Sequence, residues 1–321
     1  MRKRFRIGLT LACLFAFGAA GYYYNRYSKE PSFEGKSLSE WVLTMHAKQA
    51  GPEQEEARTV VRQLGSKSIP LLLHWLREGD SPSLDERIYD LKSSVFGWLA
   101  AHHIIKPRSV TIIGFHLNHR TVAGLALAEL EPTDKKAVIP VLIQMLGDKK
   151  HKSDEMSGGI SVLAGNAFTA LPLLAPESIA PLIDALSSQD FQVWVLAKGA
   201  LGNIGPEAKA AIPALEKRLR DKDPKIRVGA AETIGELGGD PNEFVPIIIQ
   251  SLPELDSDDL DETLDILLHY KEHAKPAVPV LLTILSNTPV SASKTNTFTR
   301  VEVINALQQI DPDAATKAGV K

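Results

Sequence analysis

The sequence predicts an all-α fold, an α–α superhelix of about seven stacked helix pairs that follows one apolar N-terminal helix. Composition supports this class. Of 321 residues, 44% are hydrophobic but only 6% are aromatic, which is typical of an Ala- and Leu-rich helical protein. A proline-led apolar pattern that recurs along the chain is the second observation. Together they predict a folded, repetitive helical protein rather than a disordered one.

The recurring pattern places Ile or Val before a proline and aliphatic residues two and six places after it. The five clear copies begin at Ile69-Pro70, Ile139-Pro140, Ile212-Pro213, Val245-Pro246 and Val278-Pro279, and Ala180-Pro181 begins a weaker one. The aliphatic residues fall on one helical stripe. Proline is tolerated in the first turn, where the amides have no intrahelical acceptor. Each copy is therefore expected to start a helix with one buried face.

The spacing of these prolines indicates a solenoid. Pro181, Pro213, Pro246 and Pro279 follow one another at intervals of 32 or 33 residues. Longer intervals earlier in the chain hold an inserted loop at Gly147–Gly159 and a degenerate stretch at Ser81–His119. One helix pair of this size cannot cover its own apolar stripe, so neighbouring pairs must stack.

The helix before each proline repeats as well. Val193, Ala197, Leu201 and Ile204 align with Ile226, Ala230, Ile234 and Leu237. Gly205 and Gly238 follow these helices, where a left-handed residue is expected. The unit is therefore two helices and a glycine turn.

The stretch "ALGNIGPEAKAAIPALEKRLRDKDPKIRVGAAETIGELG" (Ala200–Gly238) resembles consecutive HEAT repeats. Its "DKDPKIRVGAAETIGELG" part matches the family pattern of an Asp-containing turn, Ile-Arg or Val-Arg, Ala-Ala and Leu-Gly. The resemblance is clear over Ala167–Leu285 and fainter over Glu53–Leu146. Asn305–Gly319 resembles a closing half-repeat, and Glu34–Met45 resembles the opening segment of exported HEAT proteins common in Planctomycetes and Verrucomicrobia.

The resemblance implies a superhelix that binds other macromolecules on its concave face. It also implies that Asp223 and Arg227 join a ladder of polar contacts between successive repeats. The stretch Ser81–His119 departs from the family pattern, so the superhelix is expected to bend or be interrupted there.

Residues 31–36 are predicted to be a linker and residues 37–321 the solenoid. Ser37 and Glu40 have capping-box spacing, and Trp41 follows as an anchor, which predicts a capping helix over Leu38–Lys48.

The C-terminal end is expected to close the solenoid. Val301, Ile304 and Leu307 form an apolar stripe for a terminal cap, and the Ser- and Thr-rich segment Ser286–Thr299 is predicted to be a loop.

Residues 1–30 are predicted to be a signal anchor or a signal peptide. Four basic residues precede the uncharged run Ile7–Tyr24, which is about long enough to cross a bilayer. Basic residues favour the cytoplasmic side, so the prediction is a single-pass inner-membrane protein with its body in the periplasm. The alternative is secretion after cleavage near Gly18 and Ala20. The single cysteine, Cys13, lies in this run, so the body can hold no disulfide or cysteine nucleophile.

Few side chains suggest chemistry. His269 and His273 have the spacing of a metal pair on one helix, but the repeat alignment puts His269 at a helix end and His273 in the next turn. The run Glu254–Asp265 holds seven acidic residues and no base, but it lacks the glycine of a calcium loop. It is interpreted as the acidic first turn of a helix.

Basic residues gather in one inter-repeat turn. They are Lys217, Arg218, Arg220, Lys222, Lys225 and Arg227, and Lys149–Lys152 holds a second group. They could form a strip for anionic partners or lipid headgroups, although solvated surface charge is the better explanation.

The predicted function is a non-enzymatic scaffold for an unknown protein partner. No catalytic, cofactor or metal residue is assigned, no cofactor or small-molecule substrate is expected, and the partner-binding residues stay unassigned. Two alternatives stay open: an enzyme resembling the HEAT-like bilin lyases, and a nucleic-acid-binding HEAT-like protein. The absence of cysteine from the body weighs against the first, and a net charge of −3 weighs against the second.

Overall fold

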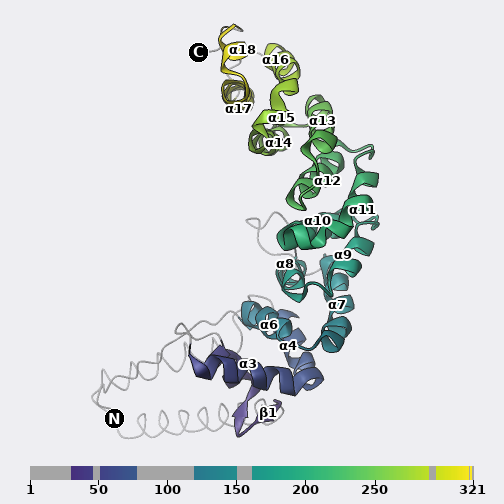
Figure 1. Cartoon of the computed structure of the whole chain (residues 1–321), viewed down its shortest axis with the longest axis vertical. Coiled ribbons are helices and arrows are strands. Elements are labelled where there is room, and N and C mark those ends of the chain that lie inside the picture. The colour runs from purple at the N-terminus through teal and green to yellow at the C-terminus, as the bar shows by residue number, and fades with distance from the viewer. Residues whose placement is uncertain are drawn as a thin grey trace, which may run out of the picture. The chain divides into compact units, whose positions relative to one another are not determined.

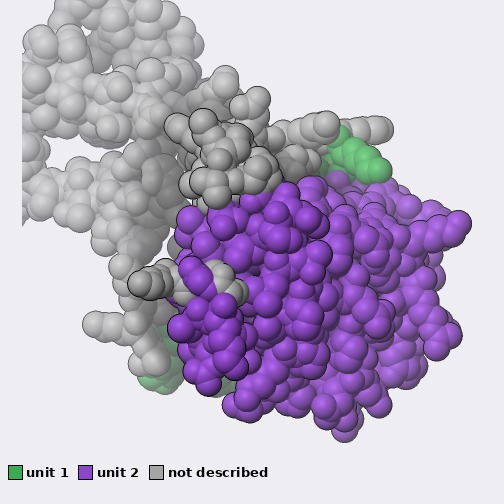
Figure 2. All heavy atoms as spheres, turned by 90° about the horizontal axis from the view of Figure 1, so that it is seen from above, with its two compact units in different colours: residues 1–138, 148–173 green, residues 139–147, 174–321 purple. Residues whose placement is uncertain are grey.

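The computed structural model describes residues 30–45, 51–77, 119–149, 161–288, 294–317 and 319. These residues form two compact units. Unit 1 comprises residues up to Val138 together with Asp148–Leu173, and unit 2 comprises Ile139–Gly147 and Leu174–Lys321. Figure 2 draws the atoms of unit 1 in green and those of unit 2 in purple. The predicted degenerate stretch Ser81–His119 lies almost wholly outside the described residues.

Unit 1 opens with a two-stranded antiparallel hairpin and continues as helices. Its elements are β1 (Ser32–Phe33), β2 (Lys36–Ser37), α2 (Leu38–Met45), α3 (Pro52–Leu64), η1 (Gly65–Lys67), α4 (Ile69–Arg77), α6 (His119–Ala128) and α8 (Val162–Ala170). Helix α7 (Pro132–Leu146) and the short η3 (Leu171–Leu174) are each divided between the units. The hairpin occupies the residues that were expected to be a linker.

The predicted capping box is present at the start of α2. The amide of Ser37 donates to Glu40 Oε2 at 2.7 Å, and the amide of Glu40 donates to Ser37 Oγ at 3.3 Å. Trp41 is 2% exposed, and its indole N–H donates to the Phe33 carbonyl at 3.1 Å. The hairpin and the cap together therefore fix the entry of the chain into the first helix pair.

A shared carboxylate and a side-chain amide hold the helices of unit 1 together. Arg58 and Arg62 of α3 reach Glu129, which follows α6, at 3.0 and 2.8 Å. Hydrogen bonding to Glu129 raises the pKa of Arg62 above its ordinary value. Asn166 of α8 donates to the carbonyl of Leu76 in α4 at 2.7 Å.

Unit 2 is a run of helix pairs joined by turns and short 3-10 segments. Its elements are α9 (Ile179–Ala185), α10 (Phe191–Ile204), η4 (Gly205–Ala211), α11 (Ile212–Arg218), α12 (Pro224–Glu236), α13 (Pro241–Ser251), η5 (Leu252–Glu254), α14 (Ser257–His269), α15 (Lys271–Ala274), η6 (Lys275–Ala277), α16 (Val278–Asn287), α17 (Lys294–Ile310) and α18 (Pro312–Lys317).

These helices form two layers (Figure 1). In the first layer, α10 packs on α12, α12 on α14, and α14 on α17. The second layer holds α9, α11, α13 and α16, each packed against the first layer. Gly205 and Gly238 have φ of 76° and 84°, so both have the positive φ that was predicted, which glycine adopts without strain.

The proline-led leucines fill the core, as the repeat pattern predicts. Five residues that lie two places after the prolines are fully buried: Leu72, Leu142, Leu215, Ile248 and Leu281. Helices α4, α11 and α16 begin one residue before their proline. The prediction is wrong for Pro140 and Pro246, which lie inside α7 and α13. Those helices start earlier because Pro132 and Pro241 already occupy their first positions.

The C-terminal cap differs from the prediction in register. Val301 is 45% exposed, whereas the buried stripe of α17 consists of Val303, Ala306, Leu307 and Ile310. Helix α17 also begins at Lys294, inside the segment predicted to be a loop. Ser and Thr are only weakly unfavourable in helices, so a well-packed helix can extend through them.

The predicted single-pass inner-membrane location is not supported, and we correct it. Within the ranges that the structure describes, no helix combines the length and apolarity that crossing a bilayer requires. The longest helix there, α17, has 17 residues and includes Lys294, Arg300 and Glu302, whereas a membrane span needs about 20 mostly apolar residues. The run Ile7–Tyr24, on which the membrane and localisation predictions rested, lies outside the described residues.

Candidate protein-binding surface

Each first-layer helix from α10 to α14 starts at an aspartate that caps it. Asp190 accepts from the amide of Gln192 at 3.0 Å, and Asp223 accepts from the amide of Lys225 at 2.9 Å. Asp256 accepts from the amide of Asp259 at 3.1 Å. This bond and, next, the bond from Lys225 lower the pKa of Asp256 to about 2. As predicted, the acidic run supplies the first turn of α14, with Asp258 and Asp259, and it continues along the helix to Asp265.

Arg227 ties α12 to the next repeat. Its Nε donates to Ser251 Oγ at 3.0 Å and its Nη2 donates to Glu254 Oε1 at 2.7 Å, while Nη1 bonds two carbonyls of the preceding turn. The expected inter-repeat ladder thus includes Arg227. Asp223 was expected in the same ladder, but its side chain instead caps the start of its own helix, α12.

The basic turn is not a continuous free strip. Lys225 Nζ pairs with Asp256 at 3.1 Å and with Asp259, and hydrogen bonds to both carboxylates raise the pKa of Lys225. Arg218 pairs with Asp221 at 3.2 Å and lies 5.6 Å from the centre of the Trp194 ring. Lys217, Arg220 and Lys222 are exposed. Of the second group, residues 150–152 lie outside the described residues.

Helices α10 and α12 pack side by side in the first layer, and we call such a contact between neighbouring first-layer helices a seam. At this seam, side chains of each helix lie across glycine backbone of the other. Lys198 Nζ lies 2.8 Å from Glu232 Oε2, and a Cβ built on Gly229 would lie 3.0 Å from Lys198 Cε. In the opposite direction, the Glu236 carboxylate lies over Gly202, where an added Cβ would collide with it. Burial raises the pKa of Glu236, Glu232 raises it further, and Lys198 partly opposes this.

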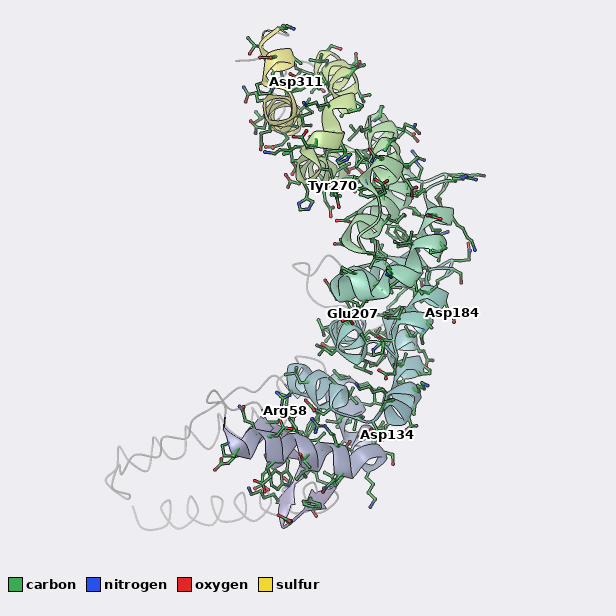
Figure 3. All side chains as sticks on the ribbon, in the orientation of Figure 1. Arg58, Asp134, Asp184, Glu207, Tyr270 and Asp311 are labelled. Atoms are coloured by element: carbon green, nitrogen blue, oxygen red, sulfur yellow. The ribbon has the colours of Figure 1, made fainter. Side chains whose placement is uncertain are left out.

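Tyr270 continues this arrangement where α14 meets α15, as labelled in Figure 3. Its hydroxyl lies over Gly235, and its ring meets Phe244 edge-on at 5.1 Å between centroids. Burial, followed by the charge of Glu236, raises the pKa of Tyr270. Sequence reasoning missed this set of side chains. The available signal was the three glycines on the first-layer helices, Gly202, Gly229 and Gly235.

The two histidines of "HYKEH" do not share a helix. His269 ends α14 and His273 lies in α15, because Tyr270 breaks the helix with φ −106° and ψ 42°. The end of α14 at His269 confirms the placement expected from the repeat alignment, whereas His273, which was expected in a turn, lies in the short helix α15. In the described ranges, no three His, Cys, Asp or Glu side chains are grouped so that they could hold a metal ion.

The fold and the ladder together define a class, the all-α solenoid built from helix pairs. The family model for HEAT repeats matches residues 179–265, which lie within unit 2. This part of unit 2 is therefore built of HEAT repeats.

Solved structures give two further similarities. One is the crystal structure of Kap121p, with a TM-score of 0.48 and 15% identity, covering 88% of this chain and 32% of that one. The chain thus spans about a third of the length of Kap121p. The other is the crystal structure of an engineered protein, with a TM-score of 0.35 and 17% identity, covering 88% of this chain and 82% of that one. No curated protein matches the sequence.

Proposed function

We propose that this protein is a non-enzymatic scaffold that binds a protein partner on the exposed face of its first layer. In the predicted superhelix this is the concave face. The observation that carries the proposal is the seam of α10, α12 and α14, where polar side chains lie across glycine backbone and the carboxylates of Glu236, Glu262 and Asp265 are exposed.

The glycines support binding in a simple way. Three glycines leave parts of the backbone of α10 and α12 without a side chain of their own, namely Gly202, Gly229 and Gly235. Long side chains from neighbouring helices lie across these positions and form the outward surface. Such a surface is preorganised, because neighbouring helices fix those side chains before a partner arrives. Stacked repeats extend it along the chain.

The charge of this face favours a protein over a nucleic acid. The exposed Glu236 of α12 and the exposed acidic residues of α14 would repel phosphates. Nucleic-acid binding depends on cations that neutralise phosphates.

Site-specific photo-cross-linking tests the proposal in cells that make the full chain. A photoreactive residue at Asn203, exposed on the first layer, should give one discrete adduct, with the captured protein identified by mass spectrometry. The matched control is the same residue at Glu216, exposed on α11 of the second layer. Equal adducts from both positions, or none from Asn203, would contradict the proposal.

A further inference from the structure

The helices α12 and α14 are consecutive copies of one first-layer helix, and their positions correspond at a spacing of 33 residues. Both are capped by an aspartate, Asp223 in one and Asp256 in the other. On this register Glu232 of α12 corresponds to Asp265 of α14, and Gly229 corresponds to Glu262. Equivalent positions on stacked repeats project from the same side of the layer.

At the seam between α10 and α12, the chain supplies its own cation. Lys198 of α10 crosses Gly229 and brings its ammonium to 2.8 Å from Glu232. Both side chains are largely covered, with 17% and 27% of their surface exposed. At this seam, the carboxylate of the first-layer helix is therefore paired with a lysine of the preceding repeat.

At the next seam the carboxylate is present and the lysine is missing. The residue that corresponds to Lys198 is Ala231, which is fully buried and has no charge. Asp265 is exposed, and so is Glu262, a second carboxylate where the first seam has glycine. Neither makes an ion pair within the part of the chain that the structure describes.

The surroundings of this seam fit a cationic side chain. Asp258 precedes Glu262 on the same exposed stripe of α14, and the stripe ends at His269. The His269 ring lies 5.0 Å from that of Tyr270, and aromatic faces attract ammonium and guanidinium groups. Lys225, the nearby cation of α12, is already held by Asp256 and Asp259.

We infer that the seam between α12 and α14 is a docking site for a lysine-rich segment of the partner protein, whose ammonium groups bind Glu262 and Asp265 in place of the missing internal lysine. This inference rests on the proposed function and names the chemistry of the partner. The occupant is a basic protein segment because Lys198 occupies the equivalent place in the preceding repeat.

A labelled peptide with lysines separated by Gly-Ser tests the inference on the full chain by fluorescence anisotropy at low ionic strength. The double variant E262Q/D265N should weaken peptide binding about tenfold, the effect of losing two exposed ion pairs. The control E207Q/E243Q removes the same charge from η4 and α13 and should bind like wild type. A peptide with glutamine in place of lysine should not bind.

A gain-of-binding variant tests the same logic in the opposite direction. Lys198→Met keeps an unbranched side chain over Gly229 but frees the Glu232 carboxylate, so peptide affinity should rise about two- to threefold. The inference is overturned if wild type does not bind the peptide, or if E262Q/D265N and its control bind equally. Should cross-linking at Asn203 still capture a protein in that case, the proposed function stands and only the chemistry of the partner is wrong.

Discussion

Lys198 of α10 and Glu232 of α12 form an ion pair of 2.8 Å across the seam of two HEAT repeats. The pair exists because Gly229 leaves the backbone of α12 uncovered, so that the lysine stem can lie on it. Glu236 and Tyr270 rest on Gly202 and Gly235 in the same way. The first layer is thus built from small residues on one helix and long polar ones on its neighbour.

Two glycine substitutions should have different effects on stability. At Gly235 an added methyl would meet the Tyr270 hydroxyl and the buried Phe244 ring, so Gly235→Ala should lower the free energy of unfolding by about 1–3 kcal/mol. At Gly202 it meets only the flexible end of Glu236, so Gly202→Ala should be neutral or stabilise by up to about 1 kcal/mol. Urea denaturation measures both. Equal destabilisation by the two variants would show that the side chain lying over each glycine does not determine the effect of the added methyl group.

Arg227→Lys should destabilise the protein by about 2 kcal/mol, because lysine cannot reproduce the planar set of bonds to Ser251, Glu254 and two carbonyls. Arg220→Lys, at an exposed position of the same turn, is the matched control and should change little. The urea midpoint distinguishes them. If both variants unfold at the midpoint of wild type, Arg227 does not hold the repeats together.

Glu236 should make stability depend on pH. Its folded pKa is raised above the ordinary 4.5, so the folded state holds the proton more tightly than the unfolded state. Its contribution is therefore fully present below about 4.5 and is lost as the pH rises through the higher folded pKa. Urea denaturation across this range should show a decline for wild type that Glu236→Gln lacks. The exposed control Glu243→Gln should keep the decline, and a Glu236→Gln curve parallel to wild type would refute the prediction.

The repeat was predictable because its spacing and its buried residues are written directly in the sequence. Leu215, Ile248 and Leu281 are fully buried because a stripe that recurs every 33 residues must face its neighbours. Helix starts were less certain, since Pro132 and Pro241 compete with Pro140 and Pro246 for the first turn.

The polar seam could not be predicted in the same way. Nothing local links Lys198 to Glu232 or Tyr270 to Gly235, because these pairs form only when neighbouring repeats dock in one register. The exposed Val301 shows the same limit. Several stripes fit the apolar residues of α17, and packing on α14 and α16 selects the one through Val303 and Leu307.

Among the described residues, the ion pairs that α10 and α12 make with the following repeat run in one direction. Lys198 reaches forward from α10 to α12, and Lys225 and Arg227 reach forward from α12 to the carboxylates of the following repeat. A cut before α12 would therefore uncover a negatively charged end at Glu232, while a cut after it would uncover a positively charged end at Lys225 and Arg227. A fragment that begins at α12 would therefore expose a negative surface at its first helix, and a fragment that ends at α12 would expose a positive surface at its last helix. These two surfaces would attract each other, so such fragments would associate end to end.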